Sequence, residues 1–182
     1  VTIGGRDLSG KSHEELATIR RHNVAFIFQF FNLIQTLTAA ENVRVIAELT
    51  DRGKGADLDE KVNSALSAVG LAGRAEHFPG QISGGQQQRV AVARAHVGSP
   101  SLILADEPTG NLDSAMANDV MELLETINNM ETTVVMVTHE PELAARARRR
   151  LHLLDGRLID LEADERPTPL VAQDADAPPA RV

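Results

Sequence analysis

The sequence predicts an α/β domain built on a mainly parallel β-sheet. Short apolar runs with strand character, at 24–28, 102–105 and 132–137, alternate with segments whose apolar residues recur at helical spacing. The run 102–105 is apolar at every position, which is typical of a parallel strand buried on both faces. Ligands of such sheets bind beyond the carboxyl ends of the strands. The polar residues that follow these runs are therefore candidate functional residues: Gln29, Asp106, Glu107 and His139.

The composition is that of an ordinary globular protein, and it excludes several classes of site. The 182 residues are 42% hydrophobic, include no Cys, Trp or Tyr, and carry a formal net charge of -8. Without Cys there is no disulfide, thiolate nucleophile or cysteine metal site, and the acidic charge argues against bulk nucleic-acid binding. No apolar run approaches the roughly 20 residues that span a bilayer. We therefore expect no nucleic-acid partner and no direct membrane insertion.

The first half of the chain contains two strand-like runs and two helix starts. The chain opens with a short β-favouring run at 1–3, and a capping box at 12–15 begins a short helix that leads into the run 24–28. A second capping box at 38–41 begins a long stretch of helical periodicity. The sequence predicts that residues from about 38 to about 96 are mostly helical and contain no strand.

The second half alternates strands and helices before the composition changes. Helical periodicity recurs at 116–127 and again behind Pro141, and Asp155-Gly156 between two apolar runs is a strong hairpin signal. Four prolines among Ala, Asp and Arg follow, with little to bury. We expect one domain over 1–161 and a disordered tail over 162–182.

Asp106 and Glu107 are adjacent acids at the end of an apolar strand. Neighbouring positions point different ways, so one carboxylate can hold Mg²⁺ near a phosphate while the other orients the attacking water or accepts its proton. The alternative is that the two acids are ordinary polar residues at the end of a strand. His139 and Gln29 have the same two interpretations, because each is either an ordinary polar residue at a strand end or a ligand contact.

The turn Ser83-Gly84-Gly85-Gln86 also allows two interpretations. It fits a capping box, so its plain structural role is to start a helix. In the functional alternative, free N–H groups and the positive end of the helix dipole bind an anion, and the two glycines let a phosphate approach the backbone.

Taken together, these residues resemble the nucleotide-binding domain of ATP-binding-cassette (ABC) ATPases over nearly all of residues 1–161. Five segments are similar to family motifs, and they occur in the family's order: Gln29 to the Q-loop, 82–86 to the signature, 102–107 to Walker B, Leu112-Asp113 to the D-loop and His139 to the switch histidine. The resemblance implies a P-loop NTPase (RecA-like) ABC ATPase core with an inserted helical subdomain. The segment ADEPTGNLDS is most similar to the branch of the family that serves lipoprotein release, macrolide export and cell division.

The resemblance also implies roles, cofactors and partners. It assigns Asp106 and Gln29 to Mg²⁺, Glu107 and Gln29 to the attacking water, and His139 to the γ-phosphate of ATP. The turn 83–86 would act on the nucleotide of the partner in a head-to-tail homodimer or paired cassette, and Asp113 would couple the two sites. A membrane permease subunit would be the further partner, with the protein peripheral on the cytoplasmic face of the membrane.

One match to a phosphate-binding pattern points elsewhere. Residues 5–12, GRDLSGKS, satisfy G-x-x-x-x-G-K-[ST], but Asp7 would put negative charge in a loop that cradles phosphates, and Ser12 already caps a helix with Glu15. In the resembling family a similar segment is a surface turn downstream of the true loop. We therefore expect Lys11 not to bind phosphate, and we expect the chain to be truncated at its amino end.

The resemblance implies that the chain is the ATP-hydrolysing subunit of an ABC transporter complex. Two alternatives to this interpretation stay open. One is a catalytically incompetent ABC module that acts as a binding or regulatory partner, and the other is a soluble ABC ATPase without a transporter. Apolar residues at 31–41, including Leu33, predict either contact with a membrane subunit or packing within the helical lobe. The arginines at 146, 148, 149 and 150 are more typical of a solvated helix end than of a lipid site.

Overall fold

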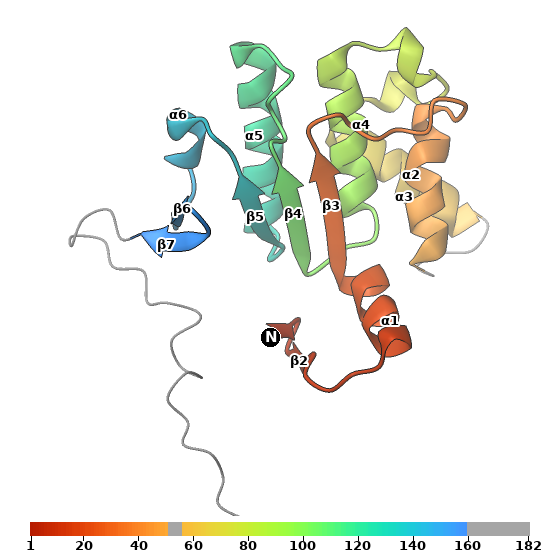
Figure 1. Ribbon diagram of the computed structural model, residues 1–182. Helices are drawn as coiled ribbons and strands as arrows, with labels where there is room; N and C mark the ends of the chain where they lie inside the picture. Colours follow the sequence, from red (N-terminus) through yellow and green to blue (C-terminus); the bar gives the residue numbers. More distant parts are fainter. Residues whose placement is uncertain (51–55, 160–182) are drawn as a thin grey trace, which may run out of the picture. The chain divides into compact units, whose positions relative to one another are not determined.

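Three parallel strands form the sheet that the sequence predicts. The computed structural model describes residues 1–50 and 56–159, and its central sheet has the order β3-β4-β5. The strands are β3 (Val24–Phe28), β4 (Leu102–Asp106) and β5 (Thr133–Val137). Phe28, Asp106 and Val137 lie abreast in the parallel register, so the three strands end at one edge (Figure 1). The predicted strands are confirmed, and β5 begins one residue later than expected.

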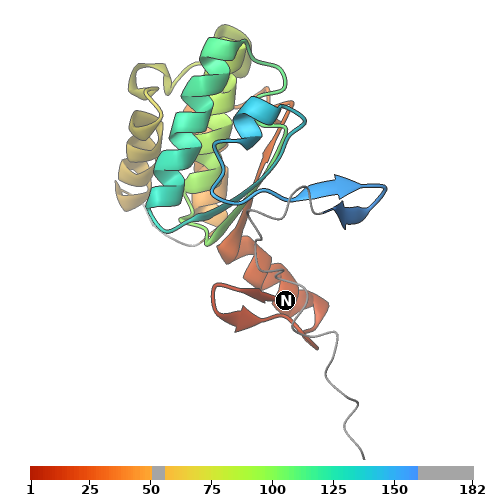
Figure 2. The same ribbon diagram turned by 90° about the vertical axis from the view of Figure 1, so that its left-hand side faces the viewer.

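Two helices cover one face of this sheet. They are α4 (Gly84–His96) and α5 (Ser114–Asn129), and both lie on the same side of the strands (Figure 2). Every second strand residue points at them, so that Ile27 and Ile103 are completely buried. The helices supply a matching apolar surface that includes Val90 and Val120. Burial of these aliphatic side chains is the main stabilisation of the sheet.

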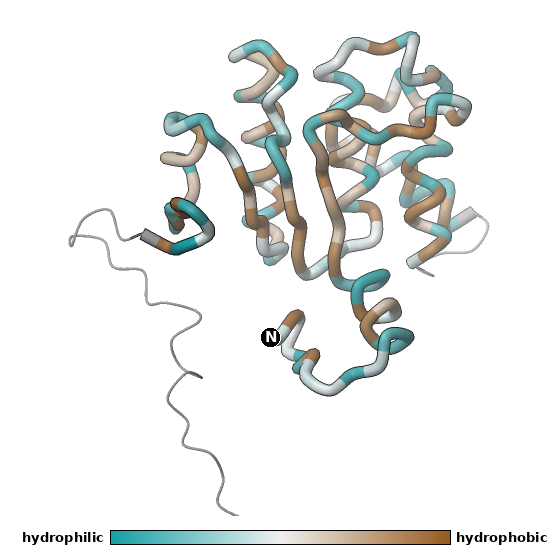
Figure 3. Tube along the Cα trace, viewed as in Figure 1, coloured by the Kyte–Doolittle hydropathy of each residue, from teal (hydrophilic) through white to brown (hydrophobic). Residues whose placement is uncertain are grey.

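The other face of the sheet is apolar, and within residues 1–139 its side chains are only partly covered. Phe26 is 41% exposed and Val137 is 61% exposed, and the rings of Phe26 and Phe28 stack with centroids 5.9 Å apart. Figure 3 shows apolar colours along all three strands. The prediction that β4 is buried on both faces is therefore wrong for this face, since Leu104 is only partly buried. The alternation that buries Ile103 turns Leu104 to the partly covered side.

The described part of the region from about 38 to 96 is mostly helical and contains no strand. Its elements are α2 (Ala39–Leu49), α3 (Ala56–Ala68), the short 3₁₀ helices η1 (Ala72–Arg74) and η2 (Pro79–Gln81), and α4. The capping box at Thr38 forms, with Glu41 bonded back to the Thr38 amide. Val43, Val62 and Leu66 are buried where the helices meet. The helical prediction is confirmed for these elements.

The amino-terminal segment forms a hairpin and a capped helix. Strands β1 (Thr2–Ile3) and β2 (Arg6–Asp7) pair antiparallel, and α1 (His13–Asn23) follows. Gly4 and Gly5 connect the two strands with φ of 55° and 74°, a left-handed turn that glycine adopts without a steric cost.

Contacts within the chain divide it into two compact units, where the sequence predicts a single domain over 1–161. The first unit covers 1–139, and the second begins at Glu140. The second contains α6 (Pro141–Ala144) and the antiparallel pair β6 (His152–Leu154) and β7 (Arg157–Ile159). The predicted hairpin at Asp155-Gly156 is confirmed, with positive φ at both residues. The predicted tail over 162–182 lies outside the described residues.

Among the helices within 1–50 and 56–159, none combines the length and the apolar character needed to cross a membrane.

Candidate functional site

The carboxyl edge of the sheet gathers the polar residues predicted from the strand ends. Gln29 directly follows β3, Asp106 ends β4, Glu107 comes next, and His139 lies two residues after β5. Because the strands are parallel and in register, their side chains emerge at the same edge. The structure thus brings together residues that are up to 110 positions apart in the sequence, as 139 minus 29 gives.

Glu107 and His139 form the best-defined contact of this edge. The Oε1 atom of Glu107 accepts a hydrogen bond from the backbone amide of His139 at 2.9 Å, and it lies 2.9 Å from Nδ1 of the ring. A carboxylate only accepts, so the ring Nδ1 donates in this pair. The Glu107 side chain is 19% exposed, and its Oε2 atom is buried with no partner among the described residues. One oxygen is thus anchored, and the other is left for a further group.

The backbone of Glu107 is held in an unusual conformation. Its φ is 44°, which costs a non-glycine residue on the order of 1 kcal/mol. Its amide donates to the carbonyl of Val137 at 2.9 Å, and this bond extends the β4–β5 ladder by one residue. The left-handed turn redirects the chain immediately after the strand, which sets the side chain toward His139. Strain of this kind persists where surrounding contacts enforce it, and it is frequent at functional sites.

Gln29 is held by the turn that follows Glu107. The Asn111 side chain donates to the Gln29 carbonyl at 2.9 Å and accepts from the Gln29 amide group at 3.5 Å. A Cβ atom at Gly110 would lie 2.8 Å from Nε2 of Gln29, so a side chain at this position would displace the end of the Gln29 side chain. Sequence reasoning missed both Gly110 and Asn111, although they lie inside the PTGNLD stretch between Glu107 and Asp113.

The glycine turn at 83–86 caps α4 as a capping box. The amide of Gln86 donates to Ser83 Oγ at 3.3 Å, and the amide of Ser83 donates to the Gln86 side chain at 3.0 Å. The plain structural role is therefore confirmed, and anion binding by this turn stays a prediction.

Gly85 packs this turn against the start of α5. A Cβ atom at Gly85 would meet Sδ of Met116 at 2.5 Å, and the Met116 amide donates to Asp113, the cap of α5, at 2.9 Å. Met116 therefore links two predicted site segments, 83–86 and Asp113, that are far apart in the sequence. Periodicity indicated Met116 only as a core residue.

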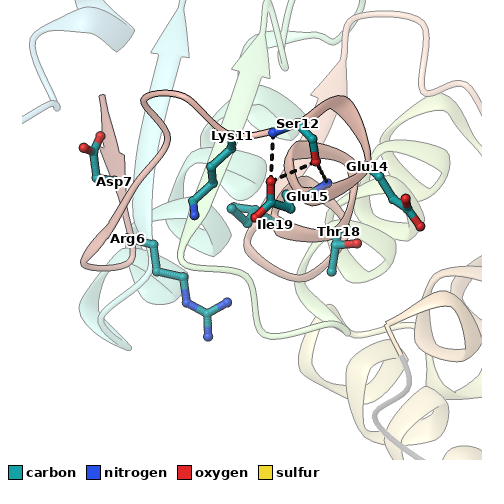
Figure 4. Close-up of a pocket in the computed structure, with 8 residues that line it drawn as sticks. All are labelled: Arg6, Asp7, Lys11, Ser12, Glu14, Glu15, Thr18 and Ile19. Atoms are coloured by element: carbon teal, nitrogen blue, oxygen red, sulfur yellow. Dashed lines mark hydrogen bonds between the residues drawn. The ribbon is translucent and has the colours of Figure 1, made fainter.

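The segment 5–12 is arranged as a helix cap. Ser12 donates from its amide and from its hydroxyl to Glu15 Oε2, each at 2.8 Å (Figure 4). The Ser9 amide donates to Asp7 at 3.0 Å. The Ser12 amide and then its hydroxyl lower the pKa of the Glu15 carboxyl, and the Ser9 amide does the same for the pKa of Asp7. Ionised carboxylates thus bind the amides that a phosphate would need.

Comparison with known proteins places these features in a family. The family model described as "ABC transporter" matches residues 1–110. The macrolide export ATP-binding/permease protein MacB of Rhodospirillum rubrum is 44% identical over 168 residues, which are 92% of this chain and 25% of that protein. The lipoprotein-releasing system ATP-binding protein LolD of Bordetella pertussis is 45% identical over 163 residues, which are 87% of this chain and 68% of that protein.

A solved structure has the same fold. The ATP-binding cassette MJ0796, solved as a dimer in a post-hydrolysis state bound to ADP and Pi, superposes with a TM-score of 0.75 at 40% sequence identity. The match covers 88% of this chain and 72% of that one. The chain spans about a quarter of the length of the MacB relatives and about two thirds of LolD. From the family match, the relatives and the parallel sheet with its polar edge, the chain belongs to the ABC transporter family and has the P-loop NTPase fold of its ATP-binding cassettes.

Proposed function

We propose that the chain is the ATP-hydrolysing subunit of an ABC transporter complex and that the carboxyl edge of its sheet is the hydrolysis site. The observation that carries the proposal is the Glu107 carboxylate, anchored through one oxygen to His139 beside Asp106. A carboxylate in this setting can accept the proton of a water molecule as the water oxygen bonds to the γ-phosphorus and ADP leaves. The Oε2 atom of Glu107 has no hydrogen-bond partner among the described residues, so it is our candidate acceptor once a movement of the side chain brings it to the water.

The residues of this edge also suit ATP and Mg²⁺. Asp106 is exposed at the end of β4 and offers the carboxylate oxygens that Mg²⁺ prefers. Gln29, held by Asn111, offers an amide oxygen for the metal or the water, and the His139 ring is exposed for a phosphate. When bound, Mg²⁺ would neutralise charge that develops on the phosphates.

We also propose that two cassettes act together with a membrane permease subunit on the cytoplasmic face. The dimeric MJ0796 cassette supports pairing, and the names of MacB and LolD support a transport role. In the pair, Ser83, Gly84, Gly85 and Gln86 would contact the partner's nucleotide, and Asp113 would couple the two sites.

The segment after Gln29 is our candidate for the permease contact. Leu33 is buried, which favours the packing interpretation for that residue, whereas Phe30 is 73% exposed and Ile34 is 46% exposed. A crosslinker therefore belongs at Ile34.

ATP turnover by the full-length protein, alone and with its membrane partner, tests the proposal. We expect phosphate release that requires Mg²⁺ and stops when EDTA removes the metal. Absence of Mg²⁺-dependent turnover in both preparations would contradict the proposed function. It would favour a second candidate, a binding or regulatory module that lends its 83–86 turn to another cassette. The carboxylates on the amides of 5–12 are the observation behind that candidate, because this segment is not arranged to hold phosphate.

Replacing Gly110 with Ala is expected to lower kcat about 10-fold. The new methyl group would overlap the Gln29 side chain, which has to leave its place beside Asn111. Steady-state phosphate release measures the effect. Gly73→Ala is the matched control, since a Cβ atom at Gly73 meets nothing within 4 Å. Equal rates in the two variants would show that Gln29 has no part in turnover.

Replacing Lys11 with Ala is expected to change kcat and the KM for ATP by less than about twofold. The amides around Lys11 are bound by Asp7 and Glu15, so this lysine does not belong to a formed phosphate loop. Lys61→Ala serves as a control, because Lys61 is a partly exposed lysine on α3 that pairs with Asp57 one turn away. A loss of ATP binding in the Lys11 variant alone would mean that segment 5–12 rearranges around phosphate.

A further inference from the structure

Gln88 is a polar side chain at a completely buried position of α4. It is 0% exposed, and its Nε2 atom donates to the carbonyl of Pro108 at 2.5 Å and to that of Phe28 at 3.4 Å. Phe28 immediately precedes Gln29, and Pro108 immediately follows Glu107. One carboxamide thus bridges the ends of two strands, next to the two residues proposed to orient the attacking water.

The rest of the Gln88 side chain argues against a packing role. Its Oε1 atom is buried without a partner among the described residues, which is an unfavourable state for a carbonyl oxygen. An apolar residue of similar length would fill the position without this cost. The polar group therefore contributes through the two hydrogen bonds that it donates.

Arg94, which also lies on α4, binds the same segment a few residues further along the chain. Its guanidinium donates to the carbonyl of Phe31 at 2.8 Å and to that of Asn32 at 2.5 Å. Phe31 and Asn32 have φ of 59° and 49°, two consecutive left-handed residues without glycine. Burial lowers the pKa of Arg94, but an arginine stays charged in proteins, so both bonds are charge-assisted. They stabilise an unfavourable turn directly after Gln29.

We propose that Gln88 and Arg94 are positioning residues, through which α4 sets the places of Gln29 and Glu107 relative to each other. The expected effect on kcat rests on the proposed ATP hydrolysis. The expected effect on the backbone around Gln29 and Glu107 rests on the hydrogen bonds alone. Sheet register aligns the strands up to Phe28 and Asp106, and beyond them the chain turns away from the ladder. The two α4 side chains bind the backbone at this point.

Gln88→Met in the full-length protein tests the structural part by hydrogen exchange with mass spectrometry. Methionine keeps the length of the side chain and removes both donors. We expect amide exchange over 107–110 and 29–32 to rise about 10-fold or more. The amide of Thr133, bonded to Ser101 at the opposite end of the sheet, should keep its rate. Arg94→Lys retains the charge but loses the paired guanidinium donors, so it should raise amide exchange only over 29–32.

Thr132→Val is the matched control for loss of a buried hydrogen bond. Thr132 donates to the carbonyl of Pro100 at 3.1 Å, at the amino end of the sheet. This variant should raise exchange near Pro100 and leave 107–110 unchanged. In phosphate release, Gln88→Met should lower kcat by 10-fold or more with KM for ATP within about threefold, and Thr132→Val should preserve kcat.

The outcomes separate this proposal from the proposed function. If Gln88→Met raises exchange uniformly over the sheet, or kcat stays at the parent value, Gln88 is a stability residue and the proposal is overturned. Should the methionine variant not fold, Gln88→Leu, which also lacks the donors, replaces it. If the parent protein turns over no ATP, the proposed function is contradicted, whereas localised exchange in Gln88→Met would still support the positioning role.

Discussion

Glu107→Gln is expected to lower kcat for ATP hydrolysis about 100-fold or more while ATP still binds. The amide keeps the shape of the side chain but cannot accept the proton of the attacking water, and loss of one such group commonly costs 10²–10⁴-fold in rate, roughly 3–5 kcal/mol. Phosphate release and binding of a fluorescent ATP analogue, measured on the same preparation, separate the two effects. Since the Glu107 side chain accepts from the His139 amide, the amide oxygen of glutamine can preserve that contact.

Glu122→Gln is the control for this substitution, because Glu122 is exposed on α5, outside the carboxyl edge. We expect the parent rate in that variant. A further expectation follows from the proposed pairing of cassettes. If ATP is sandwiched between two protomers, Glu107→Gln should accumulate dimers in the presence of ATP, detected by size-exclusion chromatography with light scattering. Turnover at the parent rate in Glu107→Gln would remove Glu107 from the mechanism.

Ile103→Ala is expected to lower the free energy of unfolding of the 182-residue chain by about 3–4 kcal/mol, because it leaves a cavity in a fully buried position of the central strand. Leu104→Ala, one residue on, should cost less than about 2 kcal/mol, since Leu104 lies on the partly exposed face of the same strand. Urea denaturation followed by circular dichroism compares the two. The pair is closely matched, because both changes remove similar numbers of methyl and methylene groups.

An equal loss in both variants would contradict the one-sided burial described for the sheet. It would indicate that the second face, which includes Phe26, Leu104 and Val137, is covered in solution. Parallel sheets are normally covered on both faces, so this comparison measures how much stability the second face contributes in the chain as it stands.

Much of the fold was predictable because its signals are local. Apolar runs ended at polar residues, capping boxes at 12–15, 38–41 and 83–86 marked helix starts, and Asp155-Gly156 marked a hairpin. Each of these patterns depends on hydrogen bonds or side-chain periodicity within a few residues. The convergence of Gln29, Glu107 and His139 followed from one further rule, that parallel strands end at a common edge.

Other features depended on contacts between distant segments. In the run QQQR, Gln88 looks like one more polar residue of a helix, and only the packing of α4 under two strand ends makes it a buried donor. Arg94 likewise looks like a surface cation until the carbonyls of Phe31 and Asn32 meet it. The burial of Leu33 and the exposure of Ile34 also follow from the path of the chain after the turn.

By itself, therefore, the sequence determined the order of strands and helices, the edge where the polar residues meet, and the resemblance that the comparisons confirm. The tertiary structure alone decided which oxygen of Glu107 is anchored, why a side chain at residue 110 would displace Gln29, and which face of the sheet α4 and α5 cover. The physical reason is that periodicity and capping act between near neighbours. The position of a carboxylate or a carbonyl within a few tenths of an ångström is set by atoms from segments far along the chain.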